Sequence, residues 1–192
     1  MFPNQSDVAP LSGAISSIIP LRGHHLLCLL TYKGLGYSPA FVERMTAVAL
    51  AIGVGASVRM VVGPDLICRA PCPRLGLAAG GAPEGLCDEA ARARDDAQIL
   101  TTIHRLYPAW GGLLRSGRVI PDLGRFVGLG RRLLRTQAHL IRASCADCAW
   151  DETCRAIIAQ DFEGVLLQPR RRCDVVPCGR AAESKRDQAV PG

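Results

Sequence analysis

The sequence predicts an α+β fold that is mostly helical, with four to six helices, a minor strand element and long loops that carry cysteines. Three observations lead to this prediction. Apolar residues recur at helical spacing in several segments, one short stretch alternates as a strand does, and cysteines stand in stretches rich in glycine and proline. With 192 residues, 48% of them hydrophobic, the chain is long enough to bury a core of ordinary size.

Two helices are expected near the start of the ordered part. Residues 24–30 form a short, strongly apolar stretch that ends at glycines, as a buried helix does. The next helix is expected from Pro39 to about Ile52, because Ser38 suits the N-cap and proline suits the first helical position. Helical spacing predicts that the buried face of this second helix consists of Phe41, Met45, Val48 and Ile52.

The later elements are expected in the following order. Residues 57–63 alternate and are rich in β-branched side chains, which predicts one strand, and a long loop with cysteines, glycines and prolines follows. Helical patterns return at residues 88–106 and at residues 122–143, where the second helix has an apolar face and an arginine-rich face. A last short helix is expected at residues 155–162.

The chain is expected to form one domain at residues 21–168, with a flexible extension at 1–20 and a disordered basic tail at 169–192. The first residues lack the basic and apolar regions of a secretory signal, which predicts a soluble, cytoplasmic protein. The longest apolar stretch, residues 47–56, is too short to cross a bilayer. Nine cysteines in a reducing compartment are more often ligands or catalysts than disulfides.

Two cysteine groups carry the strongest chemical signal. Cys145, Cys148 and Cys154 have the spacing C-x2-C-x5-C, which suits thiolate binding of zinc or of an iron–sulfur cluster. Cys68, Cys72 and Cys87 form a second group in the long loop. The pair of groups favours metal binding, while a redox or catalytic dithiol and inert buried cysteines remain alternatives.

A third feature is the segment RGHHLLC. On a helix, His24 and His25 stand four and three residues before Cys28, so either imidazole can share a face with the thiol. The segment fits metal-ligand or catalytic roles, and it fits equally well a core cysteine with histidines that cap the helix. Trp150, between the cysteines, is expected to pack and to exclude water from a bound cluster.

Other functional classes receive little support. The arginines of residues 115–142 fit a solvated face, or docking of an acidic protein or an anionic substrate, and no nucleic-acid motif accompanies them. The glycine-rich stretches lack the residues of a dinucleotide or phosphate loop, and the zinc-protease and serine-hydrolase motifs are absent. Cysteine chemistry is what remains.

Three segments together resemble a known family. LRGHHLLCLLTYKGLGYSPAFVE, GPDLIC and IRASCADCAWDETCRAIIAQDFEGVLL are similar to the bacterial and archaeal family called domain of unknown function 1284, over roughly residues 21–167. The resemblance implies binding of an iron–sulfur cluster. By position it points to Arg22, His24, His25, Cys28, Cys68, Cys87, Cys145, Cys148, Trp150 and Cys154. Cys72 has a counterpart in some members, while Cys173 and Cys178 lie outside the resemblance.

The expected function is therefore that of an iron–sulfur protein, with one 4Fe-4S cluster that draws on the loop and on the C-terminal array. The seven candidate ligands are Cys28, Cys68, Cys72, Cys87, Cys145, Cys148 and Cys154, with His24 and His25 as possible further ligands. Electron transfer or support of a partner redox enzyme is expected, with an acidic redox protein as partner and no nucleic acid or membrane. The alternatives are a structural zinc module, or an enzyme that uses the cluster or a Cys28–histidine nucleophile.

Overall fold

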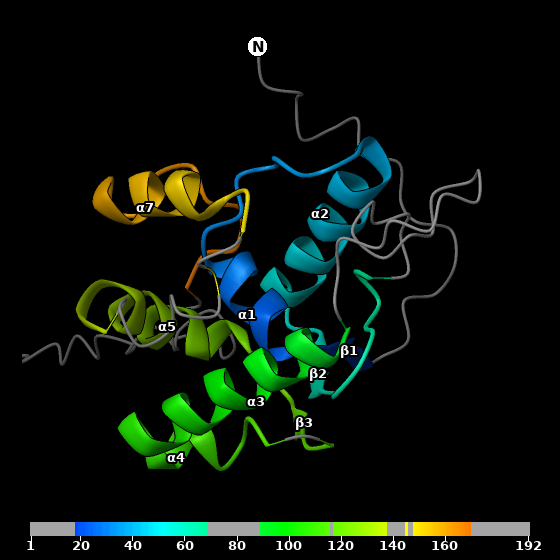
Figure 1. The fold of residues 1–192 in the computed structure, drawn as a ribbon, viewed down its shortest axis with the longest axis vertical. Helices are drawn as coiled ribbons and strands as arrows, with labels where there is room; N and C mark the ends of the chain where they lie inside the picture. Colours follow the sequence, from blue (N-terminus) through cyan, green and yellow to red (C-terminus); the bar gives the residue numbers. More distant parts are fainter. Residues whose placement is uncertain (1–17, 69–88, 116, 138–144, 146–147, 170–192) are drawn as a thin grey trace, which may run out of the picture.

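The computed structural model describes residues 18–68, 89–115, 117–137, 145 and 148–169 (Figure 1). Their elements follow the order β1 (Ile18–Leu21), α1 (Gly23–Leu30), α2 (Pro39–Gly53), β2 (Ser57–Met60), α3 (Glu89–Leu106), α4 (Pro108–Gly111), β3 (Val119–Ile120), α5 (Gly124–Thr136) and α7 (Asp151–Ala159). The predicted class, α+β and mostly helical, is confirmed. No described helix is long and apolar enough to cross a membrane.

A small sheet in the order β1-β2-β3 supports the helices. β1 pairs in parallel with β2, with Ile19 opposite Val58, and β3 pairs antiparallel with β2. A parallel pair needs a crossover, which α1 and α2 supply. The predicted strand is present but ends at Met60. The other two strands were not predicted, because β1 contains a proline and β3 has two residues.

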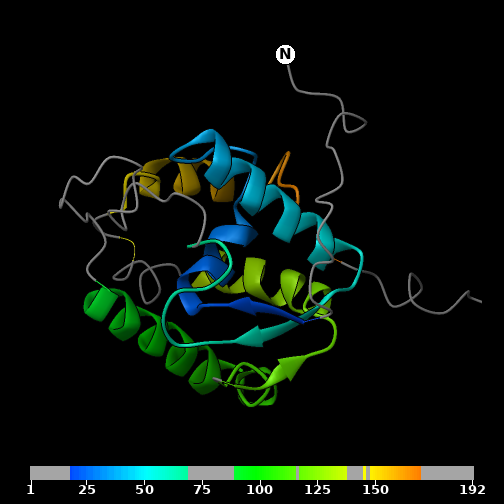
Figure 2. The same ribbon diagram turned by 90° about the vertical axis from the view of Figure 1, so that its right-hand side faces the viewer.

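Helix α1 lies at the centre of the described part, with the strands on one side and α7 on the other (Figure 2). Its leucines belong to the core, and it packs against α3 and α5. Helix α2 forms as predicted: the Ser38 hydroxyl accepts a hydrogen bond from the backbone N–H of Phe41 at 3.2 Å. The residues expected on its buried face are all buried, namely Phe41, Met45, Val48 and Ile52.

The remaining boundaries differ from the predictions in two informative places. Helix α7 begins at Asp151, four residues before the predicted start, so that Cys154 is a helical residue. Its first turn carries Asp151 and Glu152, which suit the positive end of a helix. Helix α5 occupies 124–136 of the predicted 122–143, and residues 138–144 lie outside the described part.

The two ends of the chain are described only in part. β1 begins at Ile18, whereas residues 1–17 and 170–192 are not described. The predicted extension and tail therefore stay predictions.

Gly130 sets the approach of α5 to α1, which gives a test of the packing. A Cβ atom at this position would lie 2.6 Å from Cδ1 of the fully buried Leu30. We expect Gly130→Ala to lower the free energy of unfolding by about 1–2 kcal/mol, because overpacking outweighs the gain in helix propensity. Urea unfolding measures this change.

Gly128→Ala is the matched control in the same helix. There the nearest atom, Cβ of Pro169, is 4.0 Å away. We expect this substitution to stabilise the protein by up to about 1 kcal/mol, since alanine favours a helix over glycine. Equal effects of the two substitutions would contradict the packing described here.

Candidate metal centre

One cavity, with a volume of about 160 Å³, gathers cysteines from distant parts of the chain. The described cysteines that line it are Cys28, Cys68, Cys145, Cys148 and Cys154, and all five are free thiols. Cys28 comes from α1, Cys68 from the segment after β2, and the others from α7 and the residues before it. Cys72 and Cys87 lie outside the described residues, so their proposed roles stay predictions.

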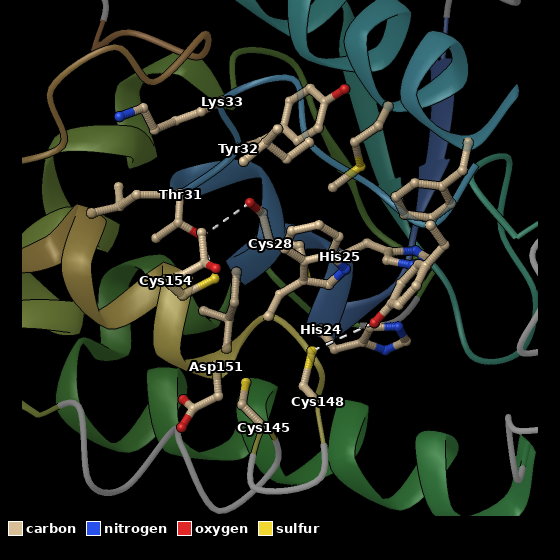
Figure 3. Close-up of a pocket in the computed structure, with 18 of the residues that line it drawn as sticks. His24, His25, Cys28, Thr31, Tyr32, Lys33, Cys145, Cys148, Asp151 and Cys154 are labelled. Atoms are coloured by element: carbon tan, nitrogen blue, oxygen red, sulfur yellow. Dashed lines mark hydrogen bonds between the residues drawn. The ribbon is translucent and has the colours of Figure 1, made fainter. Parts of the chain in front are cut away.

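The C-terminal array is a turn followed by a helix. The backbone N–H of Cys148 donates to the carbonyl of Cys145 at 2.9 Å, and that of Cys154 donates to the carbonyl of Trp150 at 2.8 Å. Cys145, Cys148 and Cys154 are three and six residues apart in the sequence, and this local geometry directs their thiols toward α1 (Figure 3). The Thr31 hydroxyl lies 3.2 Å from the Cys154 sulfur, and the Tyr37 hydroxyl lies 3.7 Å from the Cys148 sulfur.

Cys28 and the three C-terminal thiols form one electrostatic group. Burial raises the pKa of Cys28 well above its usual value, and Cys145, Cys148 and Cys154 raise it further. Burial raises the pKa of Cys145 to about 11, with Cys148 and Cys154 as further causes. Without a cation, the thiols of Cys28 and Cys145 are therefore neutral at pH 7. A bound metal would supply the positive charge that stabilises their thiolate forms.

Cys68 has different surroundings within the same cavity. Its sulfur accepts a hydrogen bond from Nη1 of Arg22 at 3.6 Å, and its backbone N–H donates to Oδ1 of Asp65 at 3.0 Å. Burial and the Asp65 carboxylate raise its pKa to about 12. Cys68 therefore lies in a buried ionic network, while Cys28 belongs with the C-terminal array.

This network holds the first turn of α1. Arg22 is fully buried, and its Nε donates to Oδ2 of Asp96 at 2.8 Å. Asp96 Oδ1 lies 2.8 Å from Nδ1 of His24 and accepts the backbone N–H of the same residue. Asp65 Oδ2 lies 2.8 Å from Nδ1 of His25. Each histidine of the HH pair is thus tied to its own buried carboxylate.

The ionisation of these groups follows from their partners. Burial and, next to it, the neighbouring His25 lower the pKa of His24 to about 4, although Asp96 acts to raise it. Burial alone would raise the pKa of Asp65, but His25 and backbone N–H donors hold it well below the usual value. The pKa of Asp96 is lowered in the same way, against the effect of burial, by His24 and Arg22.

Sequence reasoning did not identify Asp65 or Asp96 as parts of the site. Asp65 stands inside GPDLIC, next to glycine and proline, where an aspartate is typical of a turn. Asp96 is one of several charged residues on α3, and nothing in the sequence distinguishes it from the others. Trp150 lines the cavity and packs edge-on against Tyr37, with ring centroids 5.9 Å apart. Its indole N–H is buried and has no hydrogen-bond partner among the described residues.

One further group has the geometry of a metal site. His25, Asp65 and Cys68 each offer a ligand atom, and these atoms lie within 4.8 Å of one another. However, the Asp65 carboxylate already accepts four hydrogen bonds, from His25 and from the backbone N–H groups of Arg22, Ile67 and Cys68. The group could hold a metal ion only by giving up some of these bonds.

Fold and site together define a small α+β protein whose central helix and C-terminal cysteine array enclose a thiol-lined cavity with a possible metal-binding group. The family model described as protein of unknown function DUF1284 matches residues 36–154, and the chain belongs to this family. The match begins after α1, so His24, His25 and Cys28 lie before the matched region. No curated protein and no solved structure matches the chain.

The low pKa of His24 predicts how stability depends on pH. The unfolded chain takes up a proton at this residue near pH 6.5, but the folded chain takes it up near pH 4. The free energy of unfolding of the metal-free protein should therefore fall as pH drops from 7 to 4, by about 3 kcal/mol from this group. Urea unfolding at a series of pH values, with a chelator present, measures the slope.

His24→Gln is the control for this pH dependence. Glutamine does not titrate, so the variant should show a smaller slope between pH 7 and pH 4. Both proteins should lose further stability below about pH 4, where the carboxylates of Asp65 and Asp96 take up protons in the unfolded chain. An unchanged slope in the variant would rule out His24 as its cause.

Proposed function

We propose that the protein binds one iron–sulfur cluster of the 4Fe-4S type through Cys28, Cys145, Cys148 and Cys154. The observation that carries the proposal is the convergence of these four thiols, from α1 and from the C-terminal array, on one cavity. Four cysteine thiolates are the usual ligand set of such a cluster. Cys68, Cys72 and Cys87 are left outside the ligand set in this proposal.

The spacing of the thiols favours a cluster over a single zinc ion. A tetrahedral zinc with Zn–S bonds of 2.3 Å brings its sulfur ligands to about 3.8 Å from one another. In the part of the chain that is described, no three of these four sulfurs lie within 4.8 Å of one another. A cluster spreads its thiolates over four iron atoms at separate corners, so it fits a wider arrangement.

The surroundings of the four thiols also suit a cluster. The hydroxyl groups of Thr31 and Tyr37 lie within hydrogen-bond distance of the sulfurs of Cys154 and Cys148. Trp150 adds an indole N–H without a partner in the described residues, and such donors suit the sulfur atoms of a cluster. The apolar walls include Leu27, Met45 and Ile157, which exclude water.

Electron transfer, or support of a partner redox enzyme, is the activity we propose for this cluster. When bound, the cluster supplies one-electron redox chemistry. Cys145, Cys148 and Cys154 are only partly buried, so the ligand array lies close to the surface that a partner would contact. The exposed arginines of α5, Arg125, Arg132 and Arg135, offer positive charge to an acidic redox protein. A cytoplasmic location accords with the reduced thiols.

Metal analysis tests the proposed cluster. Protein purified without oxygen should be brown and contain about four iron and four acid-labile sulfide per chain. Cys28→Ser, Cys145→Ser, Cys148→Ser and Cys154→Ser should each lose most of the iron and sulfide, because each removes one ligand. Cys68→Ser is the matched control and should keep both.

Two results would contradict this ligand set. A colourless protein with one zinc per chain would replace the cluster with a structural zinc site, and chelation should then unfold the chain. Full iron and sulfide in Cys28→Ser, with their loss in Cys68→Ser, would instead assign the fourth ligand to the segment after β2.

Tyr37→Phe tests the hydrogen bond to Cys148. Removal of the hydroxyl should lower the reduction potential of the cluster by an amount on the order of tens of millivolts, because a donor near a ligand sulfur stabilises the reduced form. Redox titration followed by electron paramagnetic resonance measures this shift. Tyr32→Phe is the control, since the Tyr32 hydroxyl bonds to Val42 and Thr46. Equal shifts in both variants would exclude a specific effect of Tyr37.

A further inference from the structure

His24 and His25 are held in an arrangement that the four-thiolate cluster does not require. Each ring has its Nδ1 atom 2.8 Å from a carboxylate oxygen, of Asp96 for His24 and of Asp65 for His25. Both carboxylates are almost completely buried. A histidine whose Nδ1–H is held by a carboxylate presents Nε2 as the free basic nitrogen, which is the usual arrangement of a metal-ligating histidine.

The Nε2 atoms are therefore the ring nitrogens left for the cavity. Both histidines line the cavity that contains the thiols, and Figure 3 shows the two side chains side by side near Cys148. Within the described residues, the hydrogen bonds of both rings are those made by Nδ1. The ring centroids lie only 4.2 Å apart, although the two residues are neighbours on a helix, where side chains usually diverge.

Helix capping explains part of this arrangement but not all of it. Asp96 accepts the backbone N–H of His24, so this carboxylate caps the first turn of α1, where Arg22 itself makes no side-chain cap. Asp65 also accepts backbone N–H groups. Capping accounts for the two carboxylates. It does not explain why both imidazoles also contact these carboxylates through Nδ1, which leaves two basic Nε2 atoms at one cavity.

We propose that His24 and His25 together bind one divalent transition-metal ion through their Nε2 atoms, in the same cavity as the thiols. With metal–nitrogen bonds of 2.0–2.1 Å, the ion would lie about 3.2 Å from each ring centroid. For an ion at which both Nε2 atoms point, centroids 4.2 Å apart correspond to a nitrogen–metal–nitrogen angle of about 80°. Such an angle suits a five- or six-coordinate ion with open positions, such as Fe²⁺ or Co²⁺, better than tetrahedral zinc.

Charge in the buried network also favours a cation. The network holds two buried carboxylates, those of Asp65 and Asp96, but only one guanidinium: that of Arg22 pairs with Asp96, and Asp65 accepts the backbone N–H of Arg22. One negative charge therefore remains when both imidazoles are neutral. A metal bound by the two Nε2 atoms would lie one imidazole ring away from these carboxylates and would leave all their hydrogen bonds in place. The proposal is independent of the cluster, because it uses none of the four thiols.

The group formed by His25, Asp65 and Cys68 is a less suitable location for the ion. A metal there would displace hydrogen bonds that the Asp65 carboxylate makes to His25 and to backbone N–H groups. It would also lie next to the Arg22 guanidinium, which contacts the Cys68 sulfur, and two adjacent cations repel each other in a buried site. The geometry therefore favours the Nε2 atoms.

Cobalt binding tests the proposal on the full chain. Protein purified without oxygen is treated with EDTA to remove labile divalent ions, and Co²⁺ is added by isothermal titration calorimetry. We expect one Co²⁺ per chain, with imidazole nitrogen detected by pulsed electron paramagnetic resonance. His24→Gln and His25→Gln should each weaken binding at least tenfold, while iron and sulfide per chain stay unchanged. His104→Gln, a histidine of α3 outside the cavity lining, is the matched control and should bind Co²⁺ normally.

A second pair of variants separates this site from the other metal sites. Cys145→Ser should lose the cluster yet still bind Co²⁺ through nitrogen, so failure of the proposed cluster leaves this test intact. Absence of Co²⁺ binding in the unsubstituted chain would overturn the proposal. Loss of Co²⁺ binding in Cys68→Ser but not in His24→Gln would also overturn it, in favour of the group with Asp65. Loss of iron together with Co²⁺ binding in both histidine variants would make the histidines cluster ligands or structural residues instead.

Discussion

The buried ion pair between Arg22 and Asp96 is the interaction on which the rest of the site depends. It joins the residue before α1 to the middle of α3, and both side chains are almost completely removed from water. A buried charge that loses its partner costs about 3–5 kcal/mol, so the two elements are held together firmly. Gly23 permits this approach, since a Cβ atom there would lie 2.9 Å from the backbone oxygen of Asp96. The position of α1 follows from this pair.

The position of α1 in turn decides what the cavity contains. Leu26, Leu29 and Leu30 face the core. The opposite side of this eight-residue helix therefore faces the cavity. That side carries His24 and Cys28, four residues apart and therefore neighbours on the helix surface. The C-terminal array closes the cavity from α7, and Thr31 at the end of α1 contacts the Cys154 sulfur. One short helix thus links the imidazole pair to the thiols.

The sequence allowed accurate prediction where local signals decide the structure. Helix α2 combines an N-cap serine, a proline at its first position and a regular apolar face, and all three features predict the same helix. The C-terminal array was predicted from its cysteine spacing and from the family resemblance, because its three cysteines stand close together in the sequence. The short strands β1 and β3 could not be predicted, because pairing with β2 rather than their own residues makes them strands. Asp65 and Asp96 were missed because their partners lie 40 and 72 positions away in the chain.

The thiols and the imidazoles of the cavity differ in the metal species that each set suits. Thiolates are soft ligands that select iron–sulfur clusters or zinc, whereas neutral imidazoles accept a wider range of divalent ions. Arg22 contributes to the separation, because its guanidinium occupies the space next to Cys68 and disfavours a further cation there. The carboxylates that contact Nδ1 of His24 and His25 instead favour a cation at the rings, since they increase the basicity of the imidazoles. The same buried network that positions α1 therefore determines where in the cavity a second positive charge is favoured.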